Sequence, residues 1–285
     1  MLGLLGDEWT LLVVQQALMG ARRYAEFKER LPISNSVLAS RLQSLTRDGL
    51  LEKCPYQTNP PRSEYLITPR GRSLWPVLLS IWEWERRWVS DHAERLPNMR
   101  HIPCGADFAP VVTCRSCGDA VTEKDINAQW GPSGSWPRSM PVTSTRRRSG
   151  ADPRDGSAGL FPETMGVLGN RWAFALLVAA FVGVSRFTDF QAQLGAAPGS
   201  ISDRLSILTA NGVLIAVGSR YRLTEKGRAF FPVLVSGLQW AQRWFRSTEG
   251  PAVVLTHTAC GAQFDAVLVC DQCAGQLRGA QVKRS

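Results

Sequence analysis

Acidic residues and histidines are scarce in this sequence. The first scarcity bears on the charge of its partners and the second on catalysis. The 285 residues contain 24 Asp and Glu against 33 Lys and Arg, a formal net charge of +9, which disfavours a cationic partner and favours an anionic one. The sequence contains three histidines, and no Ser/His/Asp or Cys/His catalytic set is recognisable, so we do not expect an enzyme. Eight of the nine excess positive charges follow residue 123.

Long apolar runs are also missing. The most apolar segment, WAFALLVAAFVGV at 172–184, is too short to cross a bilayer as a helix, which needs about 20 residues. We interpret it as a buried helix. The N-terminal apolar stretch lacks a preceding basic run and is interrupted by Asp7 and Glu8, so we expect no secretory signal and a cytoplasmic protein. Cytoplasmic thiols stay reduced, which leaves metal binding or redox chemistry for the seven cysteines.

The chain consists of two copies of one unit. Matching residues lie 163 positions apart up to Gly49 and 156 apart from Thr68 onward. The second copy is therefore seven residues shorter in that one segment, as expected for a loop. The matching segments are GDEWTLLVV and GNRWAFALL, RRYAEFKERL and SRFTDFQAQL, ASRLQSLTRDGLL and SDRLSILTANGVL, and YLITPRGRSLWPVL and YRLTEKGRAFFPVL.

Each element of the first copy has a local signal. TLLVVQQAL and YAEFKERL carry apolar residues at helical spacing. Ser34 and its polar neighbours favour the start of a third helix through VLASRLQSLTRDG, which Gly49 ends. LLEKCPY and SEYLIT predict two strands around the turn QTNPPR. Thr68 caps a last helix through LWPVLLSIWEWERRWV, with Pro69 at its first position and an expected kink at Pro76.

These elements predict a mostly α protein with small β wings, an α+β fold. It would hold two winged helix-turn-helix domains in tandem, each followed by a long helix and a small zinc-ribbon-like knuckle. The segment between the copies is rich in Gly, Pro, Ser and Arg, which favours a flexible linker. The expected domains are a first winged helix-turn-helix at 1–95, a first knuckle at 96–123, the linker at 124–159, a second winged helix-turn-helix at 160–248, and a second knuckle with a tail at 249–285.

The order of motifs resembles the HxlR-type, MarR-related bacterial transcription regulators. The resemblance rests on the W-T-L-L start, the R-L-x-x-L-x-x-x-G-L stretch, the P-P-R-x-E-Y wing and the L-T-x-x-G-R cap, over about residues 3–90 and, less closely, 166–246. It implies DNA binding and dimerisation through the first and last helices. Because two units are fused, it also implies an intrachain pseudo-dimer. The second copy has GSRYRLT in place of the P-P-R-x-E-Y wing, so its DNA contacts can differ.

We expect the third helix of each unit to enter the DNA major groove, where Arg contacts guanine and Asn contacts adenine. For Arg41 the alternative is a surface salt bridge to Asp48 or Glu52. The linker run Arg146–Arg148 is either a clamp on phosphates or a solvated stretch. The candidate DNA-contacting residues are Arg22, Arg23, Ser34, Asn35, Ser36, Ser40, Arg41, Lys53 and Arg62, and in the second copy Arg186, Ser200, Ser202, Arg204 and Arg220.

Each copy ends in a His-x2-Cys pair and a Cys-x2-Cys pair separated by nine residues. Zinc takes four Cys and His ligands in structural sites, so we expect one structural zinc ion per copy and no open position for catalysis. The alternatives are reduced packing thiols or redox-active CxxC pairs. The residues between the pairs, ADFAPVVT and AQFDAVLV, favour a small hairpin. The candidate ligands are His101, Cys104, Cys114 and Cys117, and His257, Cys260, Cys270 and Cys273.

Tryptophans concentrate in the last helix of each copy. We expect them to form a core and an interface between these two helices. The alternative is an aromatic cavity for a planar hydrophobic effector, lined by Trp84, Trp88, Trp240 and Trp244.

We therefore predict a sequence-specific DNA-binding transcriptional regulator, a repressor rather than an activator, that binds two half-sites. Its other partner would be a hydrophobic or aromatic small-molecule effector. The rival prediction, motivated by the altered second wing and the tryptophans, is a protein that binds or sequesters a drug or metabolite on a winged-helix scaffold with weak or lost DNA binding. Further homodimerisation of the chain stays open.

Overall fold

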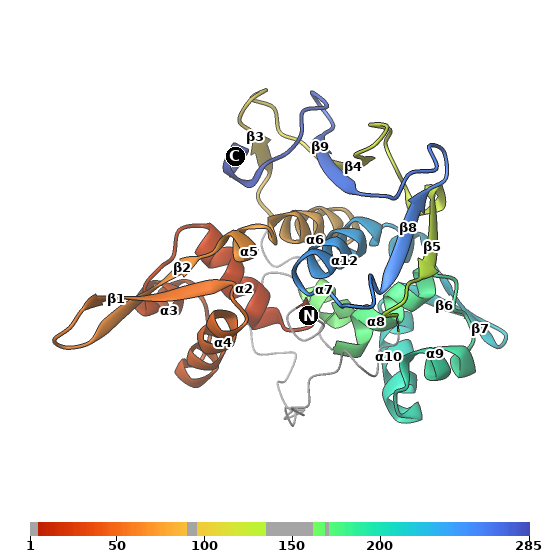
Figure 1. The fold of residues 1–285 in the computed structure, drawn as a ribbon, viewed down its shortest axis with the longest axis horizontal. Coiled ribbons are helices and arrows are strands. Elements are labelled where there is room, and N and C mark those ends of the chain that lie inside the picture. Colours follow the sequence, from red (N-terminus) through yellow and green to blue (C-terminus); the bar gives the residue numbers. More distant parts are fainter. Residues whose placement is uncertain (1–4, 90–95, 135–161, 169–170) are drawn as a thin grey trace.

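The structure is a computed structural model that describes residues 5–89, 96–134, 162–168 and 171–285 (Figure 1). The first unit has the three helices and the antiparallel wing that the sequence predicts. Its last predicted helix is divided into two. The elements are α2 (Glu8–Leu18), α3 (Tyr24–Arg30), α4 (Asn35–Arg47), β1 (Leu51–Gln57), β2 (Arg62–Ile67), α5 (Pro69–Arg72) and α6 (Trp75–Trp88).

The helix boundaries of this unit follow its capping residues. The Ser34 side chain accepts a hydrogen bond from the Val37 N–H and starts α4, and Gly49 follows α4 with φ +72°. The Thr68 side chain accepts from the Gly71 N–H, with Pro69 in the first turn of α5. The predicted kink at Pro76 is wrong: Pro76 lies in the first turn of a separate helix, α6, where a missing N–H leaves no bond unmade.

The second unit repeats this order. The predicted buried helix at 172–184 is confirmed up to Phe181, where α8 ends, and Ala173–Ala179 are all buried. Within the described residues, no helix is long and apolar enough to cross a membrane. The elements are α7 (Pro162–Leu168), α8 (Arg171–Phe181), α9 (Phe187–Leu194), α10 (Pro198–Ala210), β6 (Leu214–Val217), β7 (Arg220–Leu223), α11 (Glu225–Arg228) and α12 (Phe231–Trp244).

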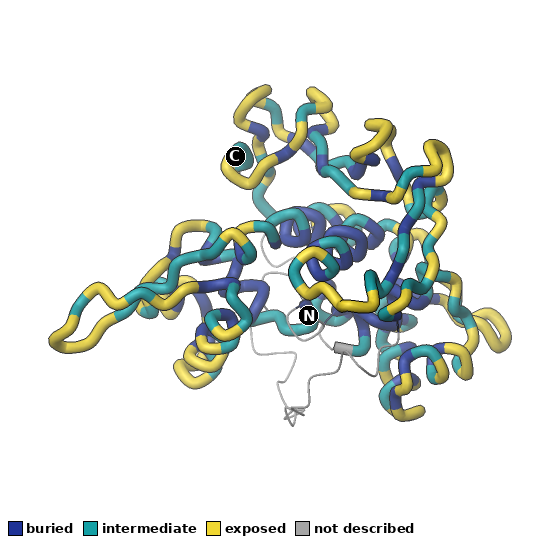
Figure 2. The backbone as a smooth tube through the Cα atoms, in the orientation of Figure 1, coloured by how far each residue is buried: buried dark blue, intermediate teal, exposed yellow. Residues whose placement is uncertain are grey.

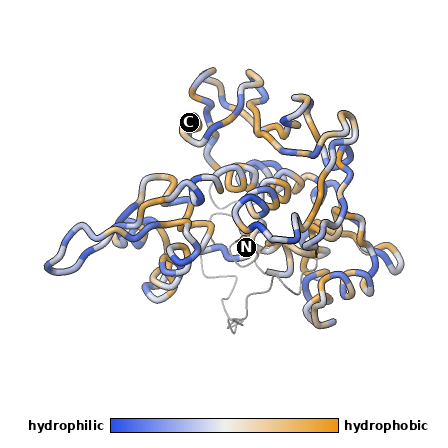
Figure 3. The backbone as a smooth tube through the Cα atoms, viewed as in Figure 1, coloured by the Kyte–Doolittle hydropathy of each residue, from blue (hydrophilic) through white to orange (hydrophobic). Residues whose placement is uncertain are grey.

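Helices α6 and α12 pack side by side, antiparallel, at the centre of the molecule (Figure 1). The Trp84 Nε1–H donates to the Lys226 carbonyl over 3.1 Å, and the Trp240 Nε1–H donates to the Arg70 carbonyl over 3.2 Å. Trp84 is the repeat equivalent of Trp240, and Lys226 is the repeat equivalent of Arg70. The two hydrogen bonds are therefore the same contact made in both directions. These helices are largely buried in Figure 2, whereas the tip of the first wing is hydrophilic in Figure 3.

Three two-stranded ribbons also join the copies, each with one strand from either copy. In the β4·β9 ribbon, Val112 lies opposite its own repeat equivalent, Leu268, and both are buried. The predicted local hairpins are therefore wrong. Pairing across the copies satisfies the backbone of both strands and joins their apolar side chains in one core. The pairs are β3 (Met99–His101) with β10 (Val282–Arg284), β4 (Pro110–Cys114) with β9 (Ala266–Cys270), and β5 (Ile126–Trp130) with β8 (Val253–His257).

The segment that the sequence predicts as a linker begins with regular structure. A 3-10 turn at Glu123–Asp125 leads into β5, and the Gly131 N–H then donates to the Ala252 carbonyl over 2.9 Å. The linker prediction is thus wrong for residues 124–134. The sequence has no apolar period there, and β5 is a strand because it pairs with β8 of the other copy. Residues 135–161, including Arg146–Arg148, lie outside the described part of the chain.

Candidate metal centres and DNA-facing surface

Four similar turns present the His and Cys side chains. Each turn follows the end of a strand. The N–H of its last residue donates a hydrogen bond to the carbonyl of its first His or Cys residue. The Gly105 N–H donates to the His101 carbonyl and the Gly118 N–H to the Cys114 carbonyl, both over 2.8 Å. The closing residue of each turn is in the left-handed region, where a side chain is strained. Gly105, Gly118 and Gly261 occupy three of these positions, and Ala274, with φ +55°, occupies the fourth.

The turns meet across the two copies. One cluster combines His101 and Cys104 with Cys270 and Cys273, and the other combines Cys114 and Cys117 with His257 and Cys260. In each cluster the ligand atoms all lie within 4.8 Å of one another. The prediction of one site per copy is therefore wrong, since each cluster takes two residues from either copy. The β4·β9 ribbon explains this, because its register carries Cys114 and Cys270 to opposite ends.

The spacing of the donor atoms fits a tetrahedral metal ion. In the first cluster, Sγ of Cys104 lies 3.9 Å from Sγ of Cys270, and Nδ1 of His101 lies 3.4 and 3.3 Å from Sγ of Cys104 and Cys273. The second cluster has the same three separations. Zinc with Zn–S of about 2.3 Å and Zn–N of about 2.0 Å would give S–S and S–N edges of about 3.8 and about 3.5 Å. All seven cysteines are free thiols.

The second cluster also favours thiolate at one position. Burial raises the pKa of Cys114, but the backbone N–H groups of Cys117 and Ser116 outweigh it and lower the pKa to about 7. For Cys117, the Asp119 N–H lowers the pKa, whereas burial, the Asp119 side chain and the neighbouring thiols raise it to about 11. A second thiolate beside the first is unfavourable, and a bound cation would remove this repulsion.

Helix α4 turns a polar face outward. Leu38, Leu42 and Leu45 are fully buried, while the predicted DNA-contacting residues Ser34, Asn35, Ser36 and Ser40 are exposed (Figure 2). The Tyr24 hydroxyl donates to the Asn35 carbonyl over 3.0 Å and fixes the start of the helix. The first turn of α4 is therefore both accessible and positioned by its neighbours.

Arg41 lies apart from this exposed group. Its guanidinium makes a two-point ion pair with Asp7, with Nη2–Oδ1 at 2.8 Å and Nε–Oδ2 at 2.5 Å. The partner is thus neither Asp48 nor Glu52, the two that the sequence suggested. Asp7 also accepts from the Thr10 N–H and caps α2, so the pair links the first and third helices of the motif. The pair engages the Nε and Nη2 edge of the guanidinium and holds it against the start of α2.

The remaining predicted contacts differ between the copies. Arg22, Arg23, Lys53 and Arg62 are all exposed on or beside the first wing. In the second copy Arg186, Ser202 and Arg220 are exposed, whereas Ser200 and Arg204 are half-buried.

The second wing is also less polar. Ile215 and Val217 are exposed apolar residues in β6, at the positions of Glu52 and Cys54 in β1. The second wing therefore differs from the first in polarity and not by a loss of positive charge, since its strands carry Arg220 and Arg222 and no acidic residue.

The tryptophans form the interface between the long helices. Trp84 and Trp240 are buried and hydrogen-bonded to the opposite unit, and the Trp244 Nε1–H donates to Oγ of Ser73 over 2.8 Å. The Nε1 atom of Trp88 is buried without a hydrogen-bond partner. None of these four side chains lines the two pockets described below, so an effector cavity at these tryptophans stays a prediction.

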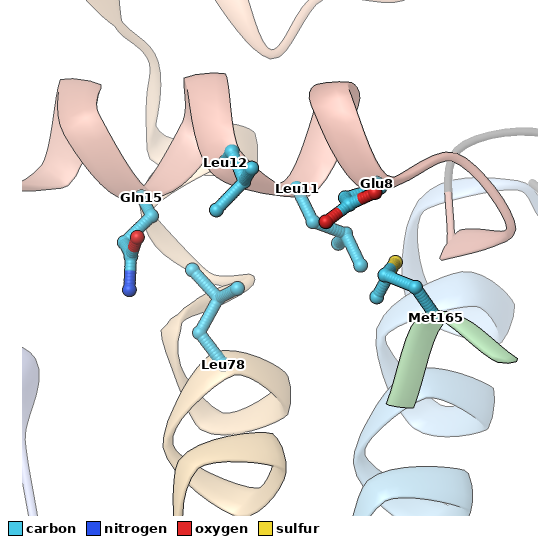
Figure 4. A pocket seen from close by; sticks show the side chains of 6 residues that line it. All are labelled: Glu8, Leu11, Leu12, Gln15, Leu78 and Met165. Carbon is cyan, nitrogen blue, oxygen red and sulfur yellow. The ribbon is translucent and has the colours of Figure 1, made fainter. Parts of the chain in front are cut away.

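One of these pockets is a seam of about 210 Å³ between the units (Figure 4). Helix α2 contributes Leu11, Leu12 and Gln15, and Met165 of α7 faces them from the second copy. Glu8 is at the same seam, and burial, followed by the charge of Asp7, raises the pKa of its carboxyl. The seam is a packing contact rather than a ligand site, because it has no space for a water molecule.

Known proteins are similar to this chain in sequence. An uncharacterized HTH-type transcriptional regulator of Mycobacterium bovis, Mb3122, is 32% identical over 131 residues, which cover 46% of this chain and 83% of the relative. YvaP, an uncharacterized HTH-type transcriptional regulator of Bacillus subtilis, is 34% identical over 87 residues, covering 30% and 81%. The solved structure of PA1607 is 31% identical, covers 46% of this chain and 96% of its own, and has a TM-score of 0.41.

The family comparison covers both copies. The model of the HxlR-like helix-turn-helix family matches residues 4–93 and again 167–249. Together these regions span more than half of the sequence, and the relatives are transcriptional regulators, a class without enzymatic activity. The chain therefore belongs to the HxlR-like helix-turn-helix family, with two such regions in tandem.

Proposed function

We propose that this protein is a sequence-specific DNA-binding transcriptional regulator whose two units act together as an intrachain pseudo-dimer. The observation that carries the proposal is the exposed polar first turn of α4, presented by a chain whose units are joined through α6 and α12. Helices α4 and α10 lie on the same side of α6 and α12 in Figure 1, with β4 and β9 on the other. This supports simultaneous contact with two half-sites on one face of a duplex.

The first unit would provide most of the affinity. Ser34, Asn35, Ser36 and Ser40 would approach base edges, and Arg22, Arg23, Lys53 and Arg62 would neutralise phosphates. In the second unit, Arg186, Ser200, Ser202, Arg204 and Arg220 would provide a weaker set, since Asp203 on the exposed face of α10 repels phosphate. Binding would block a promoter, which makes repression the expected outcome.

The two Cys/His clusters would each hold a structural zinc ion. Three thiols and one imidazole supply four ligands and leave no open position, so the metal would contribute to folding rather than to chemistry. Because each cluster includes both copies, zinc would hold the units in the relative orientation that the half-sites require.

A library of duplexes tests DNA binding directly. Selection at moderate salt should recover one preferred sequence with two unequal half-sites. Lys53→Ala should weaken binding to all sequences and reduce the salt dependence by about one counterion. Asn35→Ala should cost about 1–3 kcal/mol at one base position and relax the preference there. Recovery of unrelated sequences with equal affinity would contradict the proposal.

A ligand-binding scaffold that has lost DNA recognition remains the rival function. The exposed Ile215 and Val217 on the second wing favour it. The same selection decides between the two, because the rival predicts no sequence preference.

A further inference from the structure

A second pocket lies between α8 and α12 of the second unit and the β5·β8 ribbon, whose strand β5 comes from the first copy. Its cavity volume is about 40 Å³, within about 420 Å³ of empty space that includes space open to solvent. The lining is apolar except for Glu123. Phe181 of α8 and Phe231 of α12 lie in it with ring centroids 6.2 Å apart, and Leu238 lies further along α12.

The first unit fills the equivalent space with tryptophan. Trp75 and Trp82 stand where the second unit has Phe231 and Leu238, 156 positions on. The Trp82 Nε1–H donates to the Pro97 carbonyl over 2.9 Å, and Pro97 is the equivalent of Val253 in the pocket wall.

Trp75 reaches another part of the same wall. A Cβ on Gly279, the equivalent of Glu123, would lie 3.2 Å from the Trp75 ring. The two indoles thus touch the positions that line the pocket in the second unit. The cavity lies where the second unit has Phe231 and Leu238 in place of the two larger indole side chains of the first unit.

We propose that this pocket binds a small monoaromatic amine. The cavity is smaller than one aromatic ring, so a single ring would lie partly in the open mouth of the pocket, and a larger ligand would find little enclosed surface. Two phenyl rings offer stacking and cation–π contact, and the Glu123 carboxylate offers an opposite charge to an ammonium group. The same surroundings disfavour an anion.

The pocket is placed to influence the DNA-facing helix. Helix α8 forms one wall through Val178 and also packs against α10, and α12 packs against α6 of the first unit. Control of DNA binding by the amine rests on the proposed function, but binding of the amine does not.

A ligand-observed NMR titration of the full chain tests the site. Benzylamine, benzyl alcohol and benzoate share one ring and differ in charge. We expect benzylamine to bind more tightly than benzyl alcohol, by about two- to fivefold for a partly exposed charge pair, and benzoate to bind most weakly. Glu123→Gln should remove the preference for benzylamine and leave benzyl alcohol unchanged.

The first unit supplies the matched variants. Leu238→Trp, and separately Phe231→Trp, should abolish benzylamine binding, since each restores a side chain that the other copy accommodates. Trp75→Phe combined with Trp82→Leu reproduces the Phe/Leu pair of the second unit, and should open the equivalent space and raise the stoichiometry of benzyl alcohol. Absence of binding by all three compounds, or binding by folded Leu238→Trp that equals the unsubstituted protein, would overturn the proposal. Failure of the duplex selection would leave this result unaffected.

Discussion

At the scale of single residues, Ala274 holds a backbone conformation that glycine holds in the three equivalent turns. A left-handed conformation costs an L-residue roughly 1–2 kcal/mol relative to glycine. Part of that gain is offset, because glycine also makes the unfolded chain more flexible. Ala274→Gly should therefore increase the free energy of unfolding by about 1 kcal/mol, measured by urea denaturation.

The matched control for this prediction is in the other copy. Gly118→Ala, at the equivalent position, should lose a similar amount, since no atom lies within 4 Å of the added Cβ and only the backbone is strained. A destabilised Ala274→Gly variant would show that the turn is not limited by its backbone conformation.

At the scale of elements, one buried indole N–H at the α6–α12 contact, that of Trp88, has no hydrogen-bond acceptor. Trp244 donates to Ser73, whereas the equivalent pair, Trp88 and Ala229, has no hydroxyl to accept the indole N–H. Ala229→Ser should supply that acceptor and stabilise the protein by about 1 kcal/mol. Thermal unfolding of this variant and of Ser73→Ala should show opposite shifts, and equal shifts of one sign would contradict the equivalence.

The helices and wings could be predicted from the sequence, because their signals are local. Leu38, Leu42 and Leu45 repeat at helical spacing, and Ser34 and Gly49 mark the ends of one helix. Strand β5 could not be predicted, because Ile126 and its neighbours gain their apolar surroundings only from β8 of the other copy. Polar composition alone favoured a linker there.

The candidate sites divide in the same way. The spacing picks out all eight side chains of the two clusters, but it cannot tell which His-x2-Cys pair meets which Cys-x2-Cys pair. Either choice supplies one His and three Cys per site, and only the β4·β9 register decides. The sequence shows Phe231 and Leu238 in place of Trp75 and Trp82, but the pocket was missed because its other wall comes from the pairing of β5 with β8, which the sequence does not show.

At the scale of the whole molecule, metal content distinguishes shared clusters from one site per copy. Native mass spectrometry of the protein should detect two zinc ions. Cys104→Ser with Cys270→Ser changes both copies but one cluster, and should remove one ion. Cys104→Ser with Cys114→Ser changes one copy but both clusters, and should remove two. The opposite result would mean that each copy binds its own ion.

The cross-copy clusters have a consequence for synthesis on the ribosome. When the first copy emerges, His101, Cys104, Cys114 and Cys117 are available, but their partners are not yet made. Neither cluster can close until its ligands from the second copy leave the exit tunnel, ending with Cys273. During that interval the incomplete Cys/His clusters can pair with those of a neighbouring nascent chain. The rate of translation would therefore influence how many molecules assemble correctly.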